Sequence, residues 1–321
     1  MTRPTGLIGA ATAGVVAAGV TRLAYTVLNQ RPPGGTKTWS RTNHRGEPVT
    51  LLEGPAVAVG AVAGALAQSA LRPAGSGAAR SGAAMALAAA GAAAFGGYDD
   101  LAGSGDRRGF RGHLGALCHG EVTTGAVKLG GIGVTGIASA ALAGGPPADV
   151  VINAGLVAGG ANLLNLFDLR PGRAIKVAVA SGTLIAAGGS LCGSRAGVAA
   201  PLAAGLSLLP EDLTERAMLG DCGANALGAQ LGTAAATLPR PARIALLAGI
   251  TGLTLASEKV SFTKVIERTP ALRWLDMLGR RPLEPVPRVR IPAPRGESAK
   301  FNGAATTLRS AENTDLAPPE E

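Results

Sequence analysis

The sequence predicts an all-α polytopic membrane protein with about nine transmembrane helices and an amphipathic helix on the inner surface. The first observation is composition, because 47% of the 321 residues are hydrophobic and only 16% are charged. The second is the presence of 48 glycines among many alanines, which allow membrane helices to approach one another closely. A soluble protein rich in Ala and Gly is the alternative reading of this composition.

Apolar runs of roughly 15 to 25 residues, close to the length that a bilayer requires, follow one another along the chain. They cover residues 5–28, 54–71, 79–98, 123–143, 147–166, 174–191, 196–209, 219–238 and 241–257. The first run lies behind Arg3 as a signal peptide would, but it is longer than the apolar part of a usual signal peptide. We therefore expect it to remain as a helix of the protein.

The composition changes after the last apolar run. Residues 1–260 form the predicted membrane domain. Residues 261–281 combine basic side chains with apolar ones such as Trp274, which predicts an amphipathic segment at the inner membrane surface. Residues 282–321 are rich in Pro, Ala, Arg and Glu and are expected to form a disordered cytoplasmic tail.

The distribution of Lys and Arg predicts the orientation of the helices. With the N-terminus outside, the inner segments hold 12 Lys and Arg residues even without the C-terminal segment, whereas the outer segments hold six. This orientation also places every acidic residue except Asp149 on the inner side. We expect a multi-pass protein of the plasma (inner) membrane, with its C-terminus in the cytoplasm and its ionisable chemistry on the inner face.

Three acidic motifs lie at predicted helix ends on this inner face. They contain Asp99 and Asp100, then Asn162, Asn165 and Asp168, and finally Asp221 within a Gly-Asp-x-Gly sequence. The members of the second motif are spaced three residues apart, so they share one side of a helix. Carboxylates gathered in one place repel one another unless a cation lies among them, and oxygen ligands favour Mg²⁺. Each motif on its own is also compatible with an ordinary helix end or turn.

Glycines and basic residues near these motifs predict a bound phosphate. Glycines let backbone N–H groups approach a phosphate at the start of a helix, where the helix dipole favours an anion. Lys128, Arg170 and Arg173 add positive charge on the same side. Together the motifs predict a magnesium and phosphate site, although Arg170 and Arg173 would serve equally well as membrane anchors on the inner side.

The three motifs, in their order along the chain, resemble the cytoplasmic motifs of the polyprenyl-phosphate sugar-1-phosphate transferases. This is the glycosyltransferase family 4 membrane family, which includes phospho-N-acetylmuramoyl-pentapeptide transferase and the UDP-GlcNAc:undecaprenyl-phosphate GlcNAc-1-phosphate transferases. The sequence from Asn43 to Gly46 resembles the family's basic first loop, and Thr124-x-x-x-Lys128 resembles its inner-end lysine motif. The resemblance covers residues 5–260.

The resemblance implies phosphoryl transfer at the membrane surface. A polyprenyl phosphate would attack the β-phosphorus of a nucleotide diphosphate-sugar and release a nucleoside monophosphate. The lipid-linked sugar pyrophosphate would serve cell-envelope glycan synthesis, including that of peptidoglycan. Mg²⁺ is the implied cofactor.

The same resemblance assigns roles to individual residues. Asp221 would bind Mg²⁺, and Asp168 would be a second metal ligand or a phosphate-site residue. The implied catalytic residues are Asp99, Asp100 and Asp168, of which Asp99 and Asp100 would handle the lipid phosphate. The implied substrate-binding residues are Asn162, Asn165, Lys128, Arg170, Arg173, His44 and Arg45.

Two departures from the family's pattern bear on the sugar donor. The family usually continues the Asp168 motif as D-G-x-D-G, but here Pro171 stands in place of the second Asp and offers neither a carboxylate nor an N–H group. The family's histidine-rich inner loop has no counterpart after residue 258. We therefore expect a UDP-sugar, with UDP-N-acetylhexosamine as the leading choice, in place of a muramoyl-peptide nucleotide.

The same departures keep a second hypothesis open, that of a catalytically weak relative acting as a lipid-phosphate binder or envelope-assembly scaffold. The retained acidic motifs argue against it, because buried carboxylates cost stability in the absence of a metal. A small-solute transporter is a third hypothesis, but the sequence has no visible internal repeat.

The expected partners are a polyprenyl phosphate, a nucleotide sugar and the membrane, with a homodimer as an open alternative. Nucleic acid is not expected, because the net charge of +9 is spread over several inner loops without interleaved aromatic residues. His113 and His119 lie near Glu121, but their spacing matches no standard zinc pattern. The three cysteines are far apart, so they indicate neither a disulfide nor a zinc site.

Overall fold

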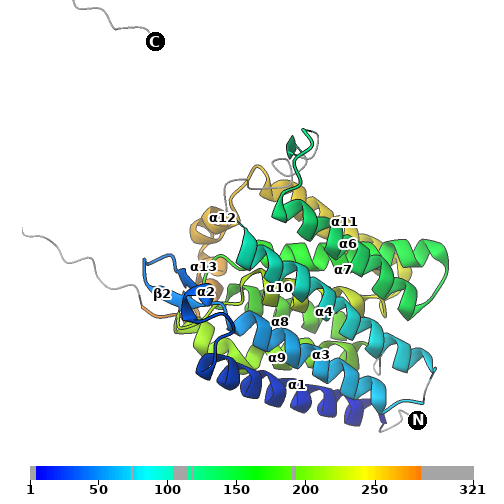
Figure 1. The fold of residues 1–321 in the computed structure, drawn as a ribbon. Helices are drawn as coiled ribbons and strands as arrows, with labels where there is room; N and C mark the ends of the chain where they lie inside the picture. Colours follow the sequence, from blue (N-terminus) through cyan, green and yellow to red (C-terminus); the bar gives the residue numbers. More distant parts are fainter. Residues whose placement is uncertain (1–4, 74, 104–114, 117–118, 190–192, 283–321) are drawn as a thin grey trace, which may run out of the picture. The chain divides into compact units, whose positions relative to one another are not determined.

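In the computed structural model, helix α10 (Gly220–Ala235) lies inside a bundle of helices, and all its residues except Asp221 are buried (Figure 1). The described part of the chain is mostly helical (77%). The structure describes residues 5–73, 75–103, 115–116, 119–189 and 193–282. The predicted tail from residue 283 onward and His113 lie outside the described residues.

The long helices pack around α10 and against one another. They are α1 (Thr5–Gln30), α3 (Glu53–Ala70), α4 (Gly77–Ala102), α6 (Thr124–Ala143), α7 (Pro147–Phe167), α8 (Arg173–Gly188), α9 (Gly193–Leu213) and α11 (Arg240–Ser257). Helices α3, α4, α6, α7, α8 and α9 contact α10. Helix α1 packs on α3 and α9, α6 also packs on α4 and α7, and α11 packs on α7.

Glycines bring α7 and α10 into backbone contact. A Cβ atom added at Gly228 would lie 2.2 Å from the carbonyl oxygen of Gly160, and one added at Gly232 would lie 2.2 Å from that of Leu156. Neither position has room for a side chain, so the two helices lie against each other along this line. Close approach of this kind is what small residues permit in membrane bundles.

Within the described residues, four helices are long and apolar enough to cross a membrane, namely Gly6–Gln30 of α1 together with α4, α6 and α7. A fifth is added if α11 and α12 (Phe262–Arg268), which are bent by 95°, count as one span. The predicted all-α class is confirmed, but the predicted count of about nine spans is not met. Helices α8 and α10 have only 16 residues each, and α9 contains Pro201 and Pro210. An apolar run in the sequence can therefore correspond either to a helix that spans a membrane or to a helix that is covered by other helices.

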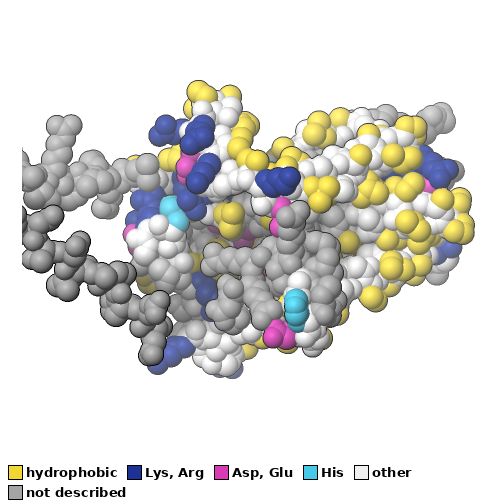
Figure 2. Space-filling model, turned by 90° about the horizontal axis from the view of Figure 1, so that it is seen from above, with side chains coloured by type: hydrophobic (Ala, Val, Ile, Leu, Met, Phe, Trp, Pro, Cys, Tyr) yellow, Lys and Arg dark blue, Asp and Glu magenta, His cyan; other side chains and the backbone are white. Residues whose placement is uncertain are grey.

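The surface of the bundle indicates association with a membrane. Large hydrophobic side chains are exposed on several helices, for example Val15 (74%), Val151 (71%) and Leu184 (73%). In Figure 2, Lys, Arg, Asp and Glu side chains gather on the left and, in smaller number, at the right-hand end, and hydrophobic side chains cover much of the surface near that end. Exposed apolar surface of this extent is unusual for a soluble monomer.

The predicted amphipathic segment forms two short helices, α12 and α13 (Pro270–Met277). The break between them coincides with Pro270, which begins α13 and cannot continue the preceding helix. Trp274 is 65% exposed, whereas Phe262 stacks on Phe167 at the end of α7 with ring centroids 5.2 Å apart. The segment therefore rests on the end of the bundle that carries the second acidic motif.

A β-hairpin that the sequence analysis did not predict lies between α1 and α3. Its elements are the short helix α2 (Thr36–Trp39) and the antiparallel strands β1 (Ser40–Thr42) and β2 (Pro48–Thr50). Thr50 accepts a backbone hydrogen bond from Met218 (3.0 Å) and donates one to Arg216 (3.3 Å). These bonds hold the hairpin beside the start of α10.

Candidate functional site

The three acidic motifs meet at the start of α10. Asp100, near the end of α4, accepts hydrogen bonds from the backbone N–H groups of Asp221 (3.0 Å) and Cys222 (2.8 Å). Asp168, which follows α7, accepts one from the backbone of Gly220. Carboxylates are favoured there because the first turn of a helix has unpaired N–H groups and the positive end of the helix dipole. The first turn of α10 therefore joins residues that lie far apart in the sequence.

Gly220 makes this junction possible. Its φ of 59° lies in the left-handed region, where a side chain is strained. A Cβ atom there would also lie 3.0 Å from Oδ2 of Asp100 and 2.9 Å from Cδ2 of Leu51. The glycine before Asp221 is therefore needed to seat the Asp100 carboxylate.

Lys128 on α6 lies between two carboxylates of the motifs. Its Nζ is 3.4 Å from Oδ2 of Asp99 and lies closer still to Oδ2 of Asp221. The ammonium group offsets the repulsion between these two negative charges. Within the described part of the chain, no group of three or more Asp, Glu, His or Cys side chains is arranged to hold a metal ion.

Asp168 has one carboxylate oxygen, Oδ2, that is enclosed by protein and has no hydrogen-bond partner. Burial raises the pKa of this carboxyl group well above its usual value, and the negative charges of Asp212, Asp221 and Asp100 raise it further. Asp212, at the end of α9, is 2% exposed and also has an oxygen without a partner. Asp168 therefore has a second carboxylate as a neighbour, although Pro171 occupies the position where the family's motif has one.

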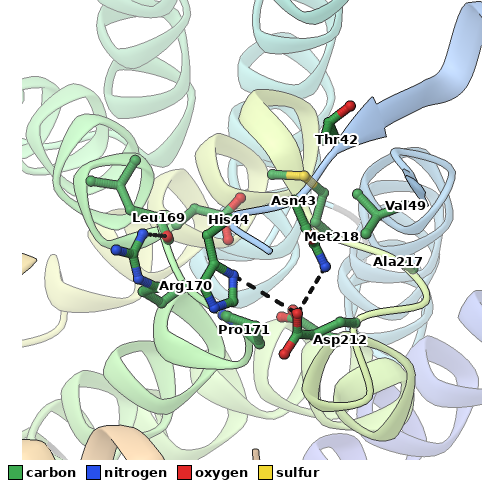
Figure 3. Close-up of a pocket in the computed structure, with 12 residues that line it drawn as sticks. Thr42, Asn43, His44, Val49, Leu169, Arg170, Pro171, Asp212, Ala217 and Met218 are labelled. Carbon is green, nitrogen blue, oxygen red and sulfur yellow. Dashed lines mark hydrogen bonds and ion pairs between the residues drawn. The ribbon is translucent and has the colours of Figure 1, made fainter. Parts of the chain in front are cut away.

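A pocket of about 190 Å³ opens beside Asp168 (Figure 3). Its lining comes from the hairpin (Thr42, Asn43, His44 and Val49), from the loop after α7 (Asp168, Leu169, Arg170 and Pro171) and from the segment between α9 and α10 (Asp212, Glu215, Ala217 and Met218). The structure thus brings His44 and Arg170 to the same pocket as Asp168. Arg45 lies behind it and pairs with Glu215 at 2.8 Å.

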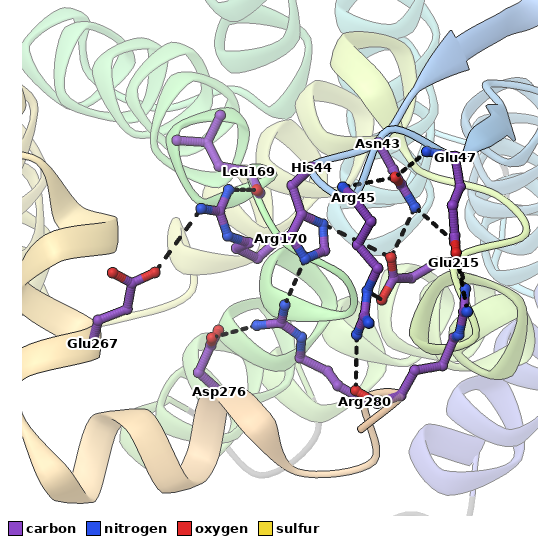
Figure 4. Close-up of polar contacts among 11 residues, drawn as sticks. Asn43, His44, Arg45, Glu47, Leu169, Arg170, Glu215, Glu267, Asp276 and Arg280 are labelled. Carbon is purple, nitrogen blue, oxygen red and sulfur yellow. Dashed lines mark hydrogen bonds and ion pairs between the residues drawn. The ribbon is translucent and has the colours of Figure 1, made fainter. Parts of the chain in front are cut away.

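A network of ion pairs ties this pocket to the chain after α13 (Figure 4). Nδ1 of His44 is 3.8 Å from Glu215, and its Nε2 is 3.4 Å from a guanidinium nitrogen of Arg280. Burial lowers the pKa of His44, and the positive charges of Arg170, Arg280 and Arg45 lower it further, against the opposing effect of Glu215. The imidazole therefore loses its proton at a lower pH than an ordinary histidine does.

Arg173 does not line the pocket. Its guanidinium is buried, donates to both carboxylate oxygens of Asp276 (2.6 and 3.1 Å) and also to Thr263 (3.0 Å). Arg280 donates to the same carboxylate at 2.7 Å. Burial by itself would raise the pKa of Asp276, but Arg173 and Arg280 lower it below its usual value. The charge of Arg173 is thus used to attach α13 to the bundle.

The two asparagines of the second motif lie on the same helix as Asp168 but outside the pocket lining. The Asn162 amide donates to the Thr254 hydroxyl on α11 at 3.2 Å, which links α7 to α11. Asn165 is half-buried in the last turn of α7.

Several residues of this site were missed by the sequence analysis. They are Asp212, Glu215, Asp276 and Arg280, together with the buried Glu53 at the start of α3. The one available signal was the acidic group Glu211, Asp212 and Glu215, which directly follows an apolar run just as the predicted motifs do. No sequence signal singles out Asp276.

The sequence matches no protein-family model and no curated protein. The resemblance to the polyprenyl-phosphate sugar-1-phosphate transferases therefore rests on the motifs alone.

Proposed function

We propose that this protein transfers a sugar-1-phosphate from a UDP-sugar to a polyprenyl phosphate at the cytoplasmic face of the plasma membrane. The observation that carries the proposal is the convergence of Asp99, Asp100, Asp168 and Asp221 on the first turn of α10, with Lys128 among them. A helix start with carboxylates and a lysine suits a reaction in which charge on phosphate groups must be offset.

The position of each residue indicates its role in the proposed reaction. Asp100 holds the start of α10 in place through two backbone hydrogen bonds, so its role is to position Asp221. Lys128 pairs with Asp99 and Asp221, offsets part of their negative charge and provides a counter-charge for a phosphate. Arg170 and His44 border the pocket in which the nucleotide sugar would bind.

Asp221 and Asp168 are the residues that would hold Mg²⁺, since both offer carboxylate oxygens and one oxygen of Asp168 has no partner. When bound, the ion would offset negative charge on the diphosphate. The donor in this proposal is UDP-N-acetylhexosamine, because Pro171 lines the pocket without a carboxylate of its own.

The direct test is release of UMP from UDP-GlcNAc by the purified protein with Mg²⁺ and undecaprenyl phosphate. UMP release that requires all three additions is the expected result. A matched control is Glu267→Gln, which changes an exposed carboxylate outside the pocket and should leave the rate unchanged. If no UDP-sugar in a panel released UMP, the proposal of enzymatic activity would lose its support.

The proposal places the whole bundle in the membrane with the N-terminus outside. Helices α3, α8, α9 and α10 would lie among the helices that are long and apolar enough to span, which accounts for the buried faces of α10. The charged hairpin, the motif residues and α12–α13 would then lie together on the cytoplasmic side, as the positive-inside rule requires.

Single cysteines provide a test of this topology in a cysteine-free background. Lys37→Cys and Lys259→Cys, both at exposed positions, should resist an impermeant thiol reagent in intact cells and react after permeabilisation. Ala148→Cys, exposed near the start of α7, should react in intact cells. Labelling of all three in intact cells would contradict the proposed orientation.

A lipid-phosphate binder or envelope scaffold is the second candidate. It is favoured because the motif residues already bind other groups of the protein. Asp100 caps α10, and Lys128 pairs with both Asp99 and Asp221. This candidate predicts saturable binding of undecaprenyl phosphate in the absence of UMP release from any UDP-sugar.

A further inference from the structure

The pocket beside Asp168 contains carboxylate oxygens that the protein itself leaves without hydrogen-bond partners. Glu215 in its wall is satisfied, because it accepts hydrogen bonds from Arg45 and Asn43 at 2.8 Å each. Asp168 and Asp212 are different, since each has an Oδ2 atom that is shielded from solvent and lacks a hydrogen-bond partner. Both side chains line the pocket.

The positive groups near these two carboxylates are directed elsewhere. Lys176 and Arg280 act electrostatically on Asp212, but they donate to the backbone oxygen and the carboxylate of Asp276, respectively, at 2.7 Å each. Arg170, in the pocket wall, donates to the carbonyl oxygen of Leu169 at 2.9 Å. No basic side chain among the described residues therefore donates to the enclosed Oδ2 atoms of Asp168 and Asp212, in a protein whose net charge is +9.

Glu53 is a third buried acid close enough to interact electrostatically with Asp212 and Asp168. It is the first residue of α3, is 0% exposed, and has no hydrogen-bond partner on either carboxylate oxygen. The charges of Asp212 and Asp168 act on it most strongly among its acidic neighbours. A buried carboxylate oxygen without a hydrogen-bond partner is costly, so three neighbouring acids that each have at least one such oxygen require an explanation beyond helix ends.

We propose that Asp168 and Asp212 hold a hydrated divalent cation in this pocket, with Glu53 supplying a further negative charge. Mg²⁺ keeps several of its waters and needs only one or two carboxylates, so a ready-made group of three ligands is not required. A volume of about 190 Å³ leaves room for an ion with some of its waters, each of which takes roughly 30 Å³ in the liquid. This site lies beside the Mg²⁺ of the proposed function: Asp168 is common to both, whereas Asp221, which pairs with Lys128, is not part of it.

Only the role of the cation rests on the proposed function, namely that it would attract a sugar diphosphate into the pocket. The binding of the cation itself does not. Binding is therefore measured without donor or lipid, by titrating Mn²⁺ into the purified full-length protein in detergent and following free Mn²⁺ by electron paramagnetic resonance. The Asp221→Asn variant should retain a Mn²⁺ site. Adding Asp212→Asn should weaken that site at least about tenfold, whereas adding Glu267→Gln should not.

Thermal unfolding tests whether a variant that loses Mn²⁺ binding is still folded. Without metal, Asp212→Asn should melt at least as high as wild type, because the change removes an uncompensated buried charge. Mg²⁺ should raise the Tm of Asp221→Asn and not that of the double variant Asp221→Asn with Asp212→Asn. If Asp212→Asn does not fold, Asp168→Asn and Asp212→Glu replace it, with loss of Mn²⁺ binding expected for the first and retention for the second.

Equal Mn²⁺ binding with and without Asp212 would overturn the inference, as would the absence of Mn²⁺ binding at millimolar concentration. A Mn²⁺ site that depends on Asp212 in a protein that releases no UMP would uphold the inference and count against the proposed function alone.

Discussion

Asp221→Asn is expected to lower the rate of UMP release by at least about 100-fold at saturating Mg²⁺, and Asp168→Asn is expected to do the same. An amide preserves the shape of each side chain and removes the charge that a divalent cation requires. Asp221 is also the partner of Lys128, so its loss leaves that ammonium paired with Asp99 alone. The measurement is the steady-state rate with UDP-GlcNAc and undecaprenyl phosphate.

Both variants should remain folded in detergent, as judged by size-exclusion chromatography and a cooperative thermal transition. The Asp100 cap on α10 uses backbone N–H groups, so it does not depend on the Asp221 carboxylate. A variant that kept more than roughly a tenth of the wild-type rate would lose its assigned role, since such a loss is smaller than that expected for a residue in direct contact with reacting groups.

The second large effect is expected at Asp276, far from the motifs in sequence. Asp276→Ala should lower the stability of the protein by about 3–5 kcal/mol, because it leaves the buried guanidinium of Arg173 without its carboxylate partner. Arg280 loses the same partner, and the attachment of α13 to the bundle is weakened. A fall of roughly 10 °C in Tm is expected from a loss of this size.

Glu267→Ala is the matched control, because Glu267 lies on the neighbouring helix α12 and its carboxylate is 55% exposed and 3.9 Å from Arg170. An exposed pair of this kind contributes at most about 1 kcal/mol. Equal Tm values for the two variants would contradict a structural role for Asp276. The comparison also bears on Arg173, since an increase in donor KM for Arg173→Ala that Asp276→Ala does not share would indicate direct contact with the diphosphate.

Apolar runs in the sequence were sufficient to locate most helices. The run 147–166 corresponds to α7 (Pro147–Phe167), and the run 219–238 to α10 (Gly220–Ala235). Boundaries agree because proline and glycine lie at helix ends, as Pro147 does at the start of α7. The hairpin was missed because strands of three residues are too short to show an alternating pattern.

The number of membrane spans could not be read from the same runs. Hydrophobicity reports that a helix avoids water, but it does not distinguish lipid from other helices as the surrounding medium. The buried α10 illustrates this, since protein covers every residue of it except Asp221.

The sequence by itself determined the helical class and the acidic, glycine-containing motifs, because these depend on residue type and on spacing along one helix. Only the tertiary structure decided which side chains meet. It placed Asp100 on the first turn of α10, paired Arg173 with Asp276, and brought Asp212 to Asp168 beside Pro171. These contacts join residues on different helices, and their partners are set by how the helices pack, which no local pattern encodes.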